Sequence, residues 1–382
     1  MASPVGDSYA VASGGVIAAG RFRLPAWRSG QAINEWREIA GSAMSNTPPT
    51  VNPGRASGSV SAKMDAWCGL AIDTRSNVVW SLANGGHDDY HGNEVMKIDL
   101  GANSPAWVEM LPSNTAAEFT VPNNAGYYSS GRPASTHSYY SQHFIEARNR
   151  AIRFGTRACS SSGFGFPNTD GYNCNAAQGV NGWDAAGTYP NLPAGGDIPA
   201  QPIVKNPATE DVFSFNSNIG VWKWTQTTNT WAQINSGYPP IDPNESASAY
   251  DTLRNRILFI RDSSIHHTFD PATGLFTDRT FTGAAASALQ SAAKAAGMIY
   301  EPVLDAYLIR LGRAAGGAVY RIDPATFEVT LMTTTGGASI PTTANISGSP
   351  ENVYGRWLYA PKLGGAFFFP QYAANAWFLR TH

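Results

Sequence analysis

Residues 63–107 decide the fold and read KMDAWCGLAIDTRSNVVWSLANGGHDDYHGNEVMKIDLGANSPAW. This stretch contains three short apolar runs, at 67–72, 78–82 and 94–100, and leads into a fourth at 107–110; polar or glycine-rich turns separate them. Apolar runs of this length between turn-forming residues indicate β-strands. The stretch therefore predicts a unit of four antiparallel strands.

The same unit recurs along the chain. An apolar run, a polar turn and a second apolar run repeat, and the turns lie at residues 72–77, 145–150, 206–211, 250–256, 300–305 and 359–364. A second turn phrase, DPAT, stands at 270–273 and 323–326. Repeats of one four-stranded unit are the sequence signature of a propeller. We expect an all-β fold, a β-propeller of six four-stranded antiparallel blades, with seven blades as the alternative if residues 112–200 contain another.

The last repeat supplies three strands, near 357–359, 366–369 and 376–380. The phrase NEWREI at 34–39 reads as a fourth strand with its tryptophan. Pairing it with the last repeat would close the ring and remove an exposed sheet edge. We therefore expect an N-terminal extension at 1–30 and a single propeller domain at 31–382, closed by an N-terminal strand.

Two segments do not follow the repeat and are predicted to be long loop insertions, at about 112–135 and 157–202. Both are rich in glycine, proline, asparagine and serine. The second also contains Phe164, Phe166, Tyr172, Trp183 and Tyr189. This aromatic density indicates an ordered loop over the propeller face.

The composition agrees with an all-β chain and excludes several classes of function. Charged residues make up 14%, against roughly 25% in average globular proteins, and glycine (38) and proline (25) are frequent. The net charge is −2 without a basic run, so no nucleic-acid partner is expected. No apolar run reaches the ~18 residues of a membrane span. The first 20 residues lack a basic segment before an apolar core, so no secretory signal is visible.

The three cysteines give no metal motif. Cys68 lies in an apolar run and is expected to be a buried small side chain. Cys159 and Cys174 flank a loop and would close it as a disulfide in an oxidising setting; the sequence leaves open whether they do. We predict no metal site and no cofactor.

One family resemblance rests on glycines and aromatics at set places in the repeat. Gly85 and Gly86 close the second strand of the first unit, and Trp107 and Trp231 stand on fourth strands. This pattern resembles kelch-like propellers of the galactose-oxidase type. The resemblance implies the fold and no activity, since the copper ligands of galactose oxidase are not matched. Residues 215–217 and 260–262 lack the glycine pair, so those repeats depart from the pattern.

Candidate site residues follow from propeller geometry. Loops between second and third strands, and loops between blades, emerge on the face where propellers usually bind ligands. Histidine and tyrosine transfer protons, and arginine stabilises a substrate carboxylate. The candidates for acid/base catalysis are His87, Tyr90, His137 and Tyr139; those for substrate binding are Arg132, Arg157, Arg261, Arg310 and Trp183. The competing interpretation is that residues 87–93, HDDYHGN, form only a well hydrogen-bonded hairpin turn.

The sequence is compatible with two functions. The first is a carbohydrate-interacting propeller that is a polysaccharide lyase or depolymerase acting on an acidic glycan. In residue types the chain is similar to propeller-shaped ulvan and oligogalacturonate lyases. The alternative is a non-catalytic receptor- or glycan-binding module such as a bacteriophage tail protein, which residues 24–30 and 65–73 resemble. The expected partners are a polysaccharide or cell-surface glycan and other virion proteins, and the expected location is a virion or the extracellular space.

Overall fold

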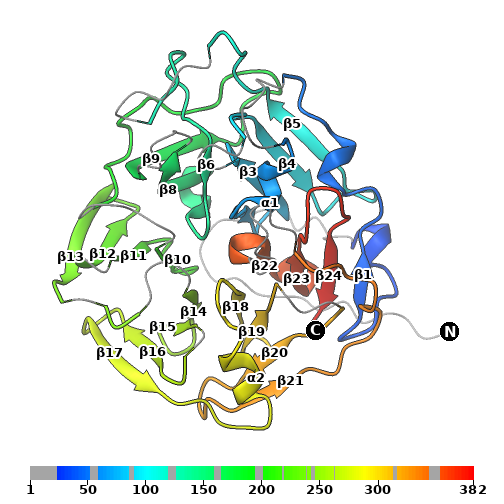
Figure 1. Ribbon diagram of the computed structural model, residues 1–382, viewed down its shortest axis with the longest axis vertical. Coiled ribbons are helices and arrows are strands. Elements are labelled where there is room, and N and C mark those ends of the chain that lie inside the picture. The colour runs from blue at the N-terminus through cyan, green and yellow to red at the C-terminus, as the bar shows by residue number, and fades with distance from the viewer. Residues whose placement is uncertain are drawn as a thin grey trace, which may run out of the picture.

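The computed structural model describes residues 24–51, 59–85, 90–118, 126–158, 165–193, 201–216, 219–237, 239–241, 246–261, 263–312, 316–343 and 353–382, with the backbone alone at 156–158 and 165–166. The described strands form six sheets arranged as a ring of blades (Figure 1). The predicted all-β propeller with six four-stranded antiparallel blades is thereby confirmed.

The blades follow one another in chain order. Blade I contains β2 (Ala71–Asp73), β3 (Val78–Leu82), β4 (Val95–Asp99) and β5 (Trp107–Leu111); blade II contains β6 (Thr136–His137), β7 (Gln142–Ile145), β8 (Arg150–Ala158) and β9 (Gly165–Asn173); blade III contains β10 (Ile203–Lys205), β11 (Val212–Asn216), β12 (Gly220–Thr225) and β13 (Thr230–Asn235). Blade IV contains β14 (Ala247–Asp251), β15 (Arg256–Ile260), β16 (His266–Asp270) and β17 (Leu275–Arg279); blade V contains β18 (Gly297–Glu301), β19 (Ala306–Arg310), β20 (Tyr320–Ile322) and β21 (Val329–Leu331). Blade VI contains β22 (Trp357–Ala360), β23 (Gly365–Phe368), β24 (Trp377–Arg380) and β1 (Trp36–Glu38).

Helical segments are short. The described residues include the α-helices α1 (Ala62–Asp65) and α2 (Ala286–Gln290) and five 3-10 turns: η1 (Ala26–Arg28), η2 (Met44–Asn46), η3 (Glu146–Arg148), η4 (Tyr354–Arg356) and η5 (Pro361–Leu363). No helix in this described part of the chain is long and apolar enough to cross a membrane.

The predicted closure by the N-terminal segment is present. Strand β1 pairs antiparallel with β24, with Trp36 opposite Leu379. The Trp36 side chain is 2% exposed, and its ring centroid lies 5.6 Å from that of Trp357. Its indole nitrogen donates to the carbonyl of Gly317 in blade V at 2.9 Å. One tryptophan thus ties the closing strand to both blade VI and blade V.

The chain enters the inner strand of each blade on one face of the ring, which we call the entry face. It turns from the inner to the second strand on the opposite face, the turn face. The residue that completes each such turn has a left-handed backbone; these residues are Asn77, Asn149, Glu210, Asn255, Asp305 and Gly364. Glycine, asparagine and aspartate adopt this conformation at low cost, which explains why the repeated turns favour them.

Polar contacts at the turn face join each blade to the next. Between blades I and II, Thr74 contacts Glu146, and between blades II and III, Glu210 accepts from the Ala147 amide at 2.7 Å. Between blades III and IV, Asn206 donates to Tyr250 at 2.9 Å, and between blades IV and V, Arg254 donates to Asp305. Between blades V and VI, Tyr359 donates to Glu301 at 2.8 Å, and between blades VI and I, Lys362 contacts the Arg75 carbonyl. The turn face is therefore held together by a complete circle of side-chain contacts.

The described part of the insertion predicted at 157–202 does not lie over the propeller face, where we expected it. Strand β9 is the third strand of blade II, and Trp183 bridges to Tyr172 on its outer edge. The Trp231 indole then donates to the Pro190 carbonyl at 3.3 Å, which carries the segment to blade III. Residues 165–193 thus run along the outer rim instead of over the face, because their aromatic rings fill the gap between two blades.

Candidate functional site

The middle of the entry face is built from strained backbone. Trp67, Tyr139, Ala295 and Tyr354 have φ values of 51°, 45°, 52° and 45°. Bulky residues avoid this left-handed region, and where such strain persists it often marks a functional site. These residues precede the inner strands of blades I, II, V and VI, so the strain is concentrated where the chain enters the ring.

Backbone hydrogen bonds hold these entry points together. The Tyr139 amide donates to the Trp67 carbonyl at 2.9 Å, and the Gly355 amide donates to the Tyr139 carbonyl at 3.2 Å. The Tyr354 amide donates to the Ala295 carbonyl at 3.1 Å. Blades that are not neighbours in the ring are therefore connected near its centre.

Three tyrosines pack together at these entry points. The ring centroid of Tyr354 lies 5.2 Å from that of Tyr139 and 5.1 Å from that of Tyr140. The Tyr140 hydroxyl donates to the Ala296 carbonyl of the opposite blade V at 3.1 Å. Burial holds the pKa of Tyr140 and Tyr354 well above the usual value, so both stay neutral. Tyr139 is half-buried.

His137 lies beside this tyrosine group. Its imidazole Nδ1 is 3.3 Å from the Tyr139 hydroxyl, and its ring centroid is 4.7 Å from that of Trp67. The side chain is 1% exposed. A neutral imidazole accepts a proton from a phenol at this separation, so the pair has the groups needed for proton transfer. The structure thus brings together two of the predicted site residues, His137 and Tyr139.

A buried ionic cluster lies next to Trp67, on the side of α1. Lys63 and Glu94 form an ion pair at 2.9 Å, and both side chains are 2% exposed. Tyr90 donates to the second Glu94 oxygen at 3.4 Å. Burial, with Glu94 as the next cause, raises the pKa of Tyr90, so the phenol stays protonated. Tyr90 and Trp67 contact the same small apolar cluster, which connects the ionic cluster to the His137 site.

Asp65 and Arg356 extend the buried charges toward blade VI. Asp65 accepts from the Tyr372 amide at 2.9 Å, and burial raises the pKa of this carboxyl. Arg356 donates to the carbonyls of Met64 and Pro370 at 3.2 and 2.9 Å, and burial lowers the pKa of its guanidinium. Sequence reasoning missed Lys63 and Asp65 as parts of the site. The sequence signal that could have identified them was a pair of charged residues two positions apart, just before the apolar run at 67–72.

The other predicted catalytic residues have different positions. His87 lies outside the described residues. Tyr90 is 1% exposed, and its contact with Glu94 makes it part of the ionic cluster.

The predicted substrate-binding residues are dispersed. Arg132 donates to the Pro112 carbonyl at 2.6 Å, and burial lowers its pKa. Arg310 is fully buried in blade V; it lies over the Phe368 ring at 5.0 Å, and burial lowers its pKa to about 10. Trp183 packs against Tyr172 on the rim of blade II.

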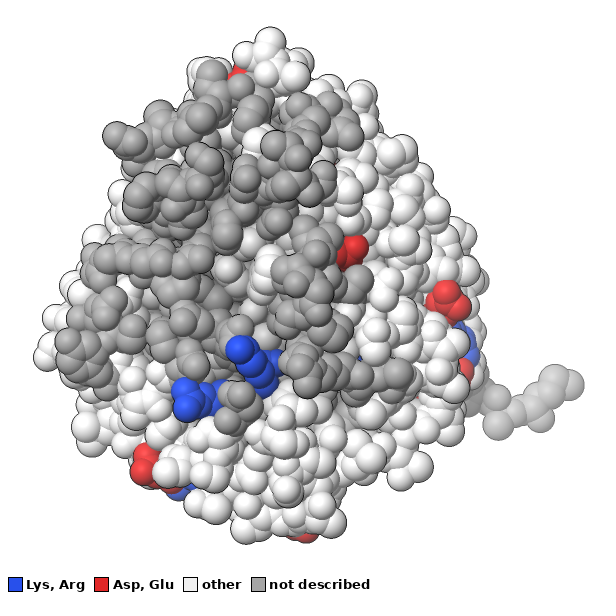
Figure 2. Space-filling model, viewed as in Figure 1, with Lys and Arg blue, Asp and Glu red and all other residues white. Residues whose placement is uncertain are grey.

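Two arginines belong to strand ends on the entry face. Arg261 follows β15 directly and is half-buried. The backbone of Arg157 pairs with His137 between β8 and β6, and its side chain is not described. Charged side chains are few on the view of Figure 2, and its two largest blue groups lie just below and to the left of the middle. Among the predicted arginines, Arg261 combines a described, half-buried side chain with a place at a strand end on the entry face, so we consider it for an anionic ligand.

The cysteines and possible metal ligands give no further site. Cys68 is buried, as expected, and its thiol donates to the Ala66 carbonyl at 3.0 Å. Cys174 is a free thiol, and Cys159 lies outside the described residues. Within the described ranges, no three histidine, cysteine, aspartate or glutamate side chains gather closely enough to hold a metal ion.

One solved structure among the comparisons with known proteins supports the fold. No protein-family model matches the chain, and no curated protein sequence matches it. A structural genomics protein of unknown function from Bacteroides thetaiotaomicron is similar in structure, with a TM-score of 0.50 and 13% identity over 90% of this chain and 74% of that one. A chain of the mitotic checkpoint complex has a TM-score of 0.45 and 11% identity, over 88% of this chain and 96% of that one. At such identities a likeness in structure concerns the fold and carries no activity.

Proposed function

We propose that this propeller binds an acidic polysaccharide at the middle of its entry face and cleaves it by β-elimination, as a polysaccharide lyase. The observation that carries the proposal is the His137–Tyr139 pair, whose Nδ1 and Oη atoms lie 3.3 Å apart beside the Trp67 ring. Aromatic rings such as Trp67 suit stacking on sugars. Arg261 is the arginine that we assign to the substrate carboxylate.

The reaction requires one base and one acid. The base removes the proton on the carbon next to the uronate carboxylate, the electron pair forms the new carbon–carbon double bond, and the glycosidic oxygen leaves with its bonding pair and takes a proton from the acid. Tyr139 is the group that we assign to proton transfer with the sugar, because it is half-buried whereas His137 is 1% exposed. His137 positions the Tyr139 hydroxyl and accepts its proton, so that the Tyr139 phenolate is the base and the phenol that results is the acid that protonates the leaving oxygen.

The test is ultraviolet absorbance of the unsaturated uronate product, recorded with a panel of acidic polysaccharides. The critical variant is Tyr139→Phe, which keeps the ring and removes the hydroxyl. We expect a loss of about 10²–10⁴-fold in kcat with polysaccharide binding retained. The matched control is Tyr320→Phe, a half-buried tyrosine on β20 of blade V, which should keep full activity. If the wild-type protein yields no unsaturated product from any member of the panel, the lyase proposal is wrong.

A second candidate is a non-catalytic glycan-binding module, such as a phage tail protein. The near-complete burial of His137 favours this second candidate. An imidazole that does not reach the ligand would position the neighbouring aromatic side chains and would transfer no proton. Saturable glycan binding by calorimetry, without product at any pH, would support this candidate. Either function fits a protein of a virion or of the extracellular space, with a cell-surface glycan as its partner.

The kelch-like blade type is part of the same proposal. A Cβ added at Gly85 would lie 2.5 Å from the Tyr90 carbonyl, so this position requires glycine, as the kelch pattern does. The test is Gly85→Ala, which should lower the thermal unfolding temperature; an unchanged temperature would remove this support.

A further inference from the structure

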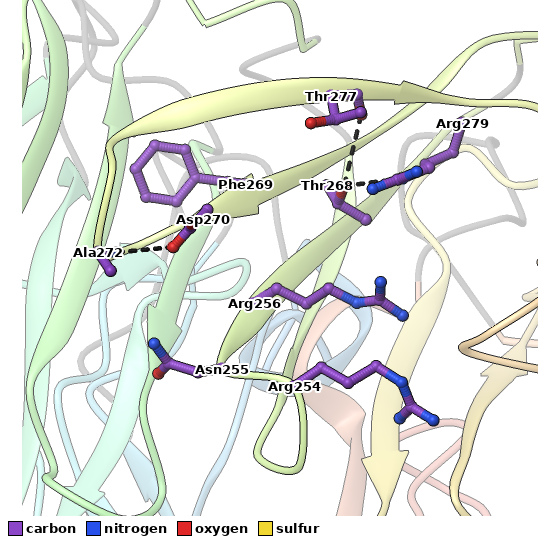
Figure 3. A pocket seen from close by; sticks show the side chains of 9 residues that line it. All are labelled: Arg254, Asn255, Arg256, Thr268, Phe269, Asp270, Ala272, Thr277 and Arg279. Atoms are coloured by element: carbon purple, nitrogen blue, oxygen red, sulfur yellow. Dashed lines mark hydrogen bonds between the residues drawn. The ribbon is translucent and has the colours of Figure 1, made fainter.

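A cavity of about 440 Å³ opens on blade IV, away from the His137 site. Its lining includes Arg254 in the turn between β14 and β15, Arg256 at the start of β15, Thr268 on β16, and Thr277 and Arg279 on β17 (Figure 3). Three arginines in one small cavity are notable in a chain with 14% charged residues.

The charges of Arg254 and Arg256 are compensated within the protein. Arg254 makes a two-point contact with Asp305, with both nitrogen–oxygen distances at 2.6 Å. The Nε atom of Arg256 lies 3.3 Å from Asp251, and its guanidinium also contacts the Pro324 carbonyl. These two arginines therefore build the wall of the cavity and keep only part of their hydrogen-bonding capacity for a ligand.

Arg279 is the arginine of this cavity that keeps hydrogen-bond donors available for a ligand. Its Nε donates to the Thr268 hydroxyl at 2.9 Å, and no carboxylate of the described residues lies within ion-pair distance. A guanidinium has five N–H donors, so its two terminal nitrogens remain available for a ligand. Burial and the neighbouring Arg256 lower the pKa of Arg279, so an anion beside it would relieve an unfavourable charge.

A phenylalanine from the next blade holds two of the guanidiniums. The Phe327 ring centroid lies 4.9 Å from Cζ of Arg279 and 5.1 Å from Cζ of Arg256. Such cation–π contacts fix the orientation of an arginine without using its N–H donors. The donors are thus preorganised, which lowers the entropy cost of binding.

We propose that this cavity binds an oxyanion, a carboxylate or a sulfate group, through the terminal nitrogens of Arg279 with the guanidinium of Arg256 beside them. Planar arginine forks match the oxygen spacing of both groups. The lining also contains Asp270, but its oxygens accept from the Ala272 amide at 2.8 Å and the Thr273 hydroxyl at 2.9 Å. Figure 3 shows Asp270 on the opposite side of the cavity from Arg279.

The test is a titration of the full chain with sodium sulfate at constant ionic strength, followed by the ¹⁵N signals of arginine Nε groups. We expect saturable shifts, and a loss of affinity of about tenfold or more in Arg279→Gln, the size expected for charge-assisted hydrogen bonds. The matched control is Arg321→Gln, at an exposed arginine of β20 whose guanidinium donates to the Leu304 carbonyl at 3.3 Å.

Each outcome decides the proposal. Equal affinity in Arg279→Gln and wild type, or a loss as large in Arg321→Gln, would overturn it, as would the absence of saturable binding. A sulfated monosaccharide that binds more tightly than free sulfate, while its unsulfated form does not bind, would identify a glycan as the source of the oxyanion. Binding of free sulfate alone would identify a small inorganic ion. The lyase assay on Tyr139→Phe is independent of all these results.

Discussion

Arg254 of blade IV and Asp305 of blade V form a two-point ion pair, with Nη1–Oδ1 and Nη2–Oδ2 both at 2.6 Å. Asp305 also accepts from Tyr300 of its own blade at 2.6 Å. The pair is one of six contacts that close the circle of blades at the turn face. Because Asp305 completes its turn in the left-handed conformation, the residue that shapes the turn also joins the blades.

Arg254→Gln should therefore destabilise the protein modestly, by about 1 kcal/mol, as expected for a partly exposed two-point ion pair. The measurement is urea unfolding at neutral pH, with Arg321→Gln as the control. The pKa of Asp305 is lowered to about 2, first by its hydrogen bond with Arg254. The contribution of the pair is thus present above pH ~4 and lost as the pH falls toward 2. Equal stability of Arg254→Gln and wild type at neutral pH would contradict the prediction.

His266 should make the protein sensitive to mild acid. Its ring stacks on Phe281 at 3.8 Å, neither ring nitrogen has a hydrogen-bond partner among the residues that the structure describes, and burial lowers its pKa to about 4. The neighbouring His267 and Arg261 lower it further. The unfolded chain therefore binds a proton near pH 6.5 that the folded protein resists until about pH 4, so stability falls as the pH drops through this window.

The expected change from His266 is about 1–2 kcal/mol between pH 7 and pH 5. The measurement is the free energy of unfolding at both values, for wild type and for His266→Phe, which keeps a stacked ring and removes the titrating group. The variant should show a smaller loss of stability. His143→Gln is the second variant, because burial lowers the pKa of His143 to about 4 as well. An identical pH dependence in wild type and His266→Phe would show that His266 is not responsible.

The sequence predicted the fold well because its signals are local. Alternating apolar runs and turns with Asn77, Asn149 or Asp305 depend on neighbouring residues alone, and Trp36 marked the closing strand by its place in a repeated pattern. The candidate site was only partly predictable. His137 and Tyr139 were found because they precede an inner strand.

Other residues depend on contacts that no local pattern contains. Arg310 was assigned to the binding face because it ends a strand, but its pairing opposite Gly297 turns it inward over Phe368. Lys63 and Glu94 are 31 positions apart, and burial of both charges is tolerable only because they meet. The arginines around Phe327 come from two strands of blade IV, and Phe327 belongs to blade V, so their cavity was not visible in the sequence.

Removing one partner of the Lys63–Glu94 pair should be strongly destabilising. Both side chains are 2% exposed, so Lys63→Met leaves a buried carboxylate that still accepts a hydrogen bond from the Tyr90 hydroxyl at 3.4 Å but has lost its cation. We expect a loss of about 3–5 kcal/mol from Lys63→Met alone, and less than the sum of the single effects from Lys63→Met with Glu94→Leu. A double-mutant cycle by chemical denaturation measures the coupling. Additive single effects would mean that the two charges do not depend on one another.

The closing strand should be essential for stability and solubility. Trp36→Ala removes a buried indole that packs on Trp357 and donates to the Gly317 carbonyl, so we expect a loss of about 3–5 kcal/mol. Loosening of β1 also exposes the edge of β24, and unpaired edges promote association between chains. Thermal unfolding and light scattering measure the two effects. The control is Trp27→Ala. Trp27 is half-buried, lies outside β1 and packs on Phe378, so its loss should lower the stability less than the loss of Trp36. If Trp36→Ala is as stable and monodisperse as Trp27→Ala, closure by β1 does not hold the ring together.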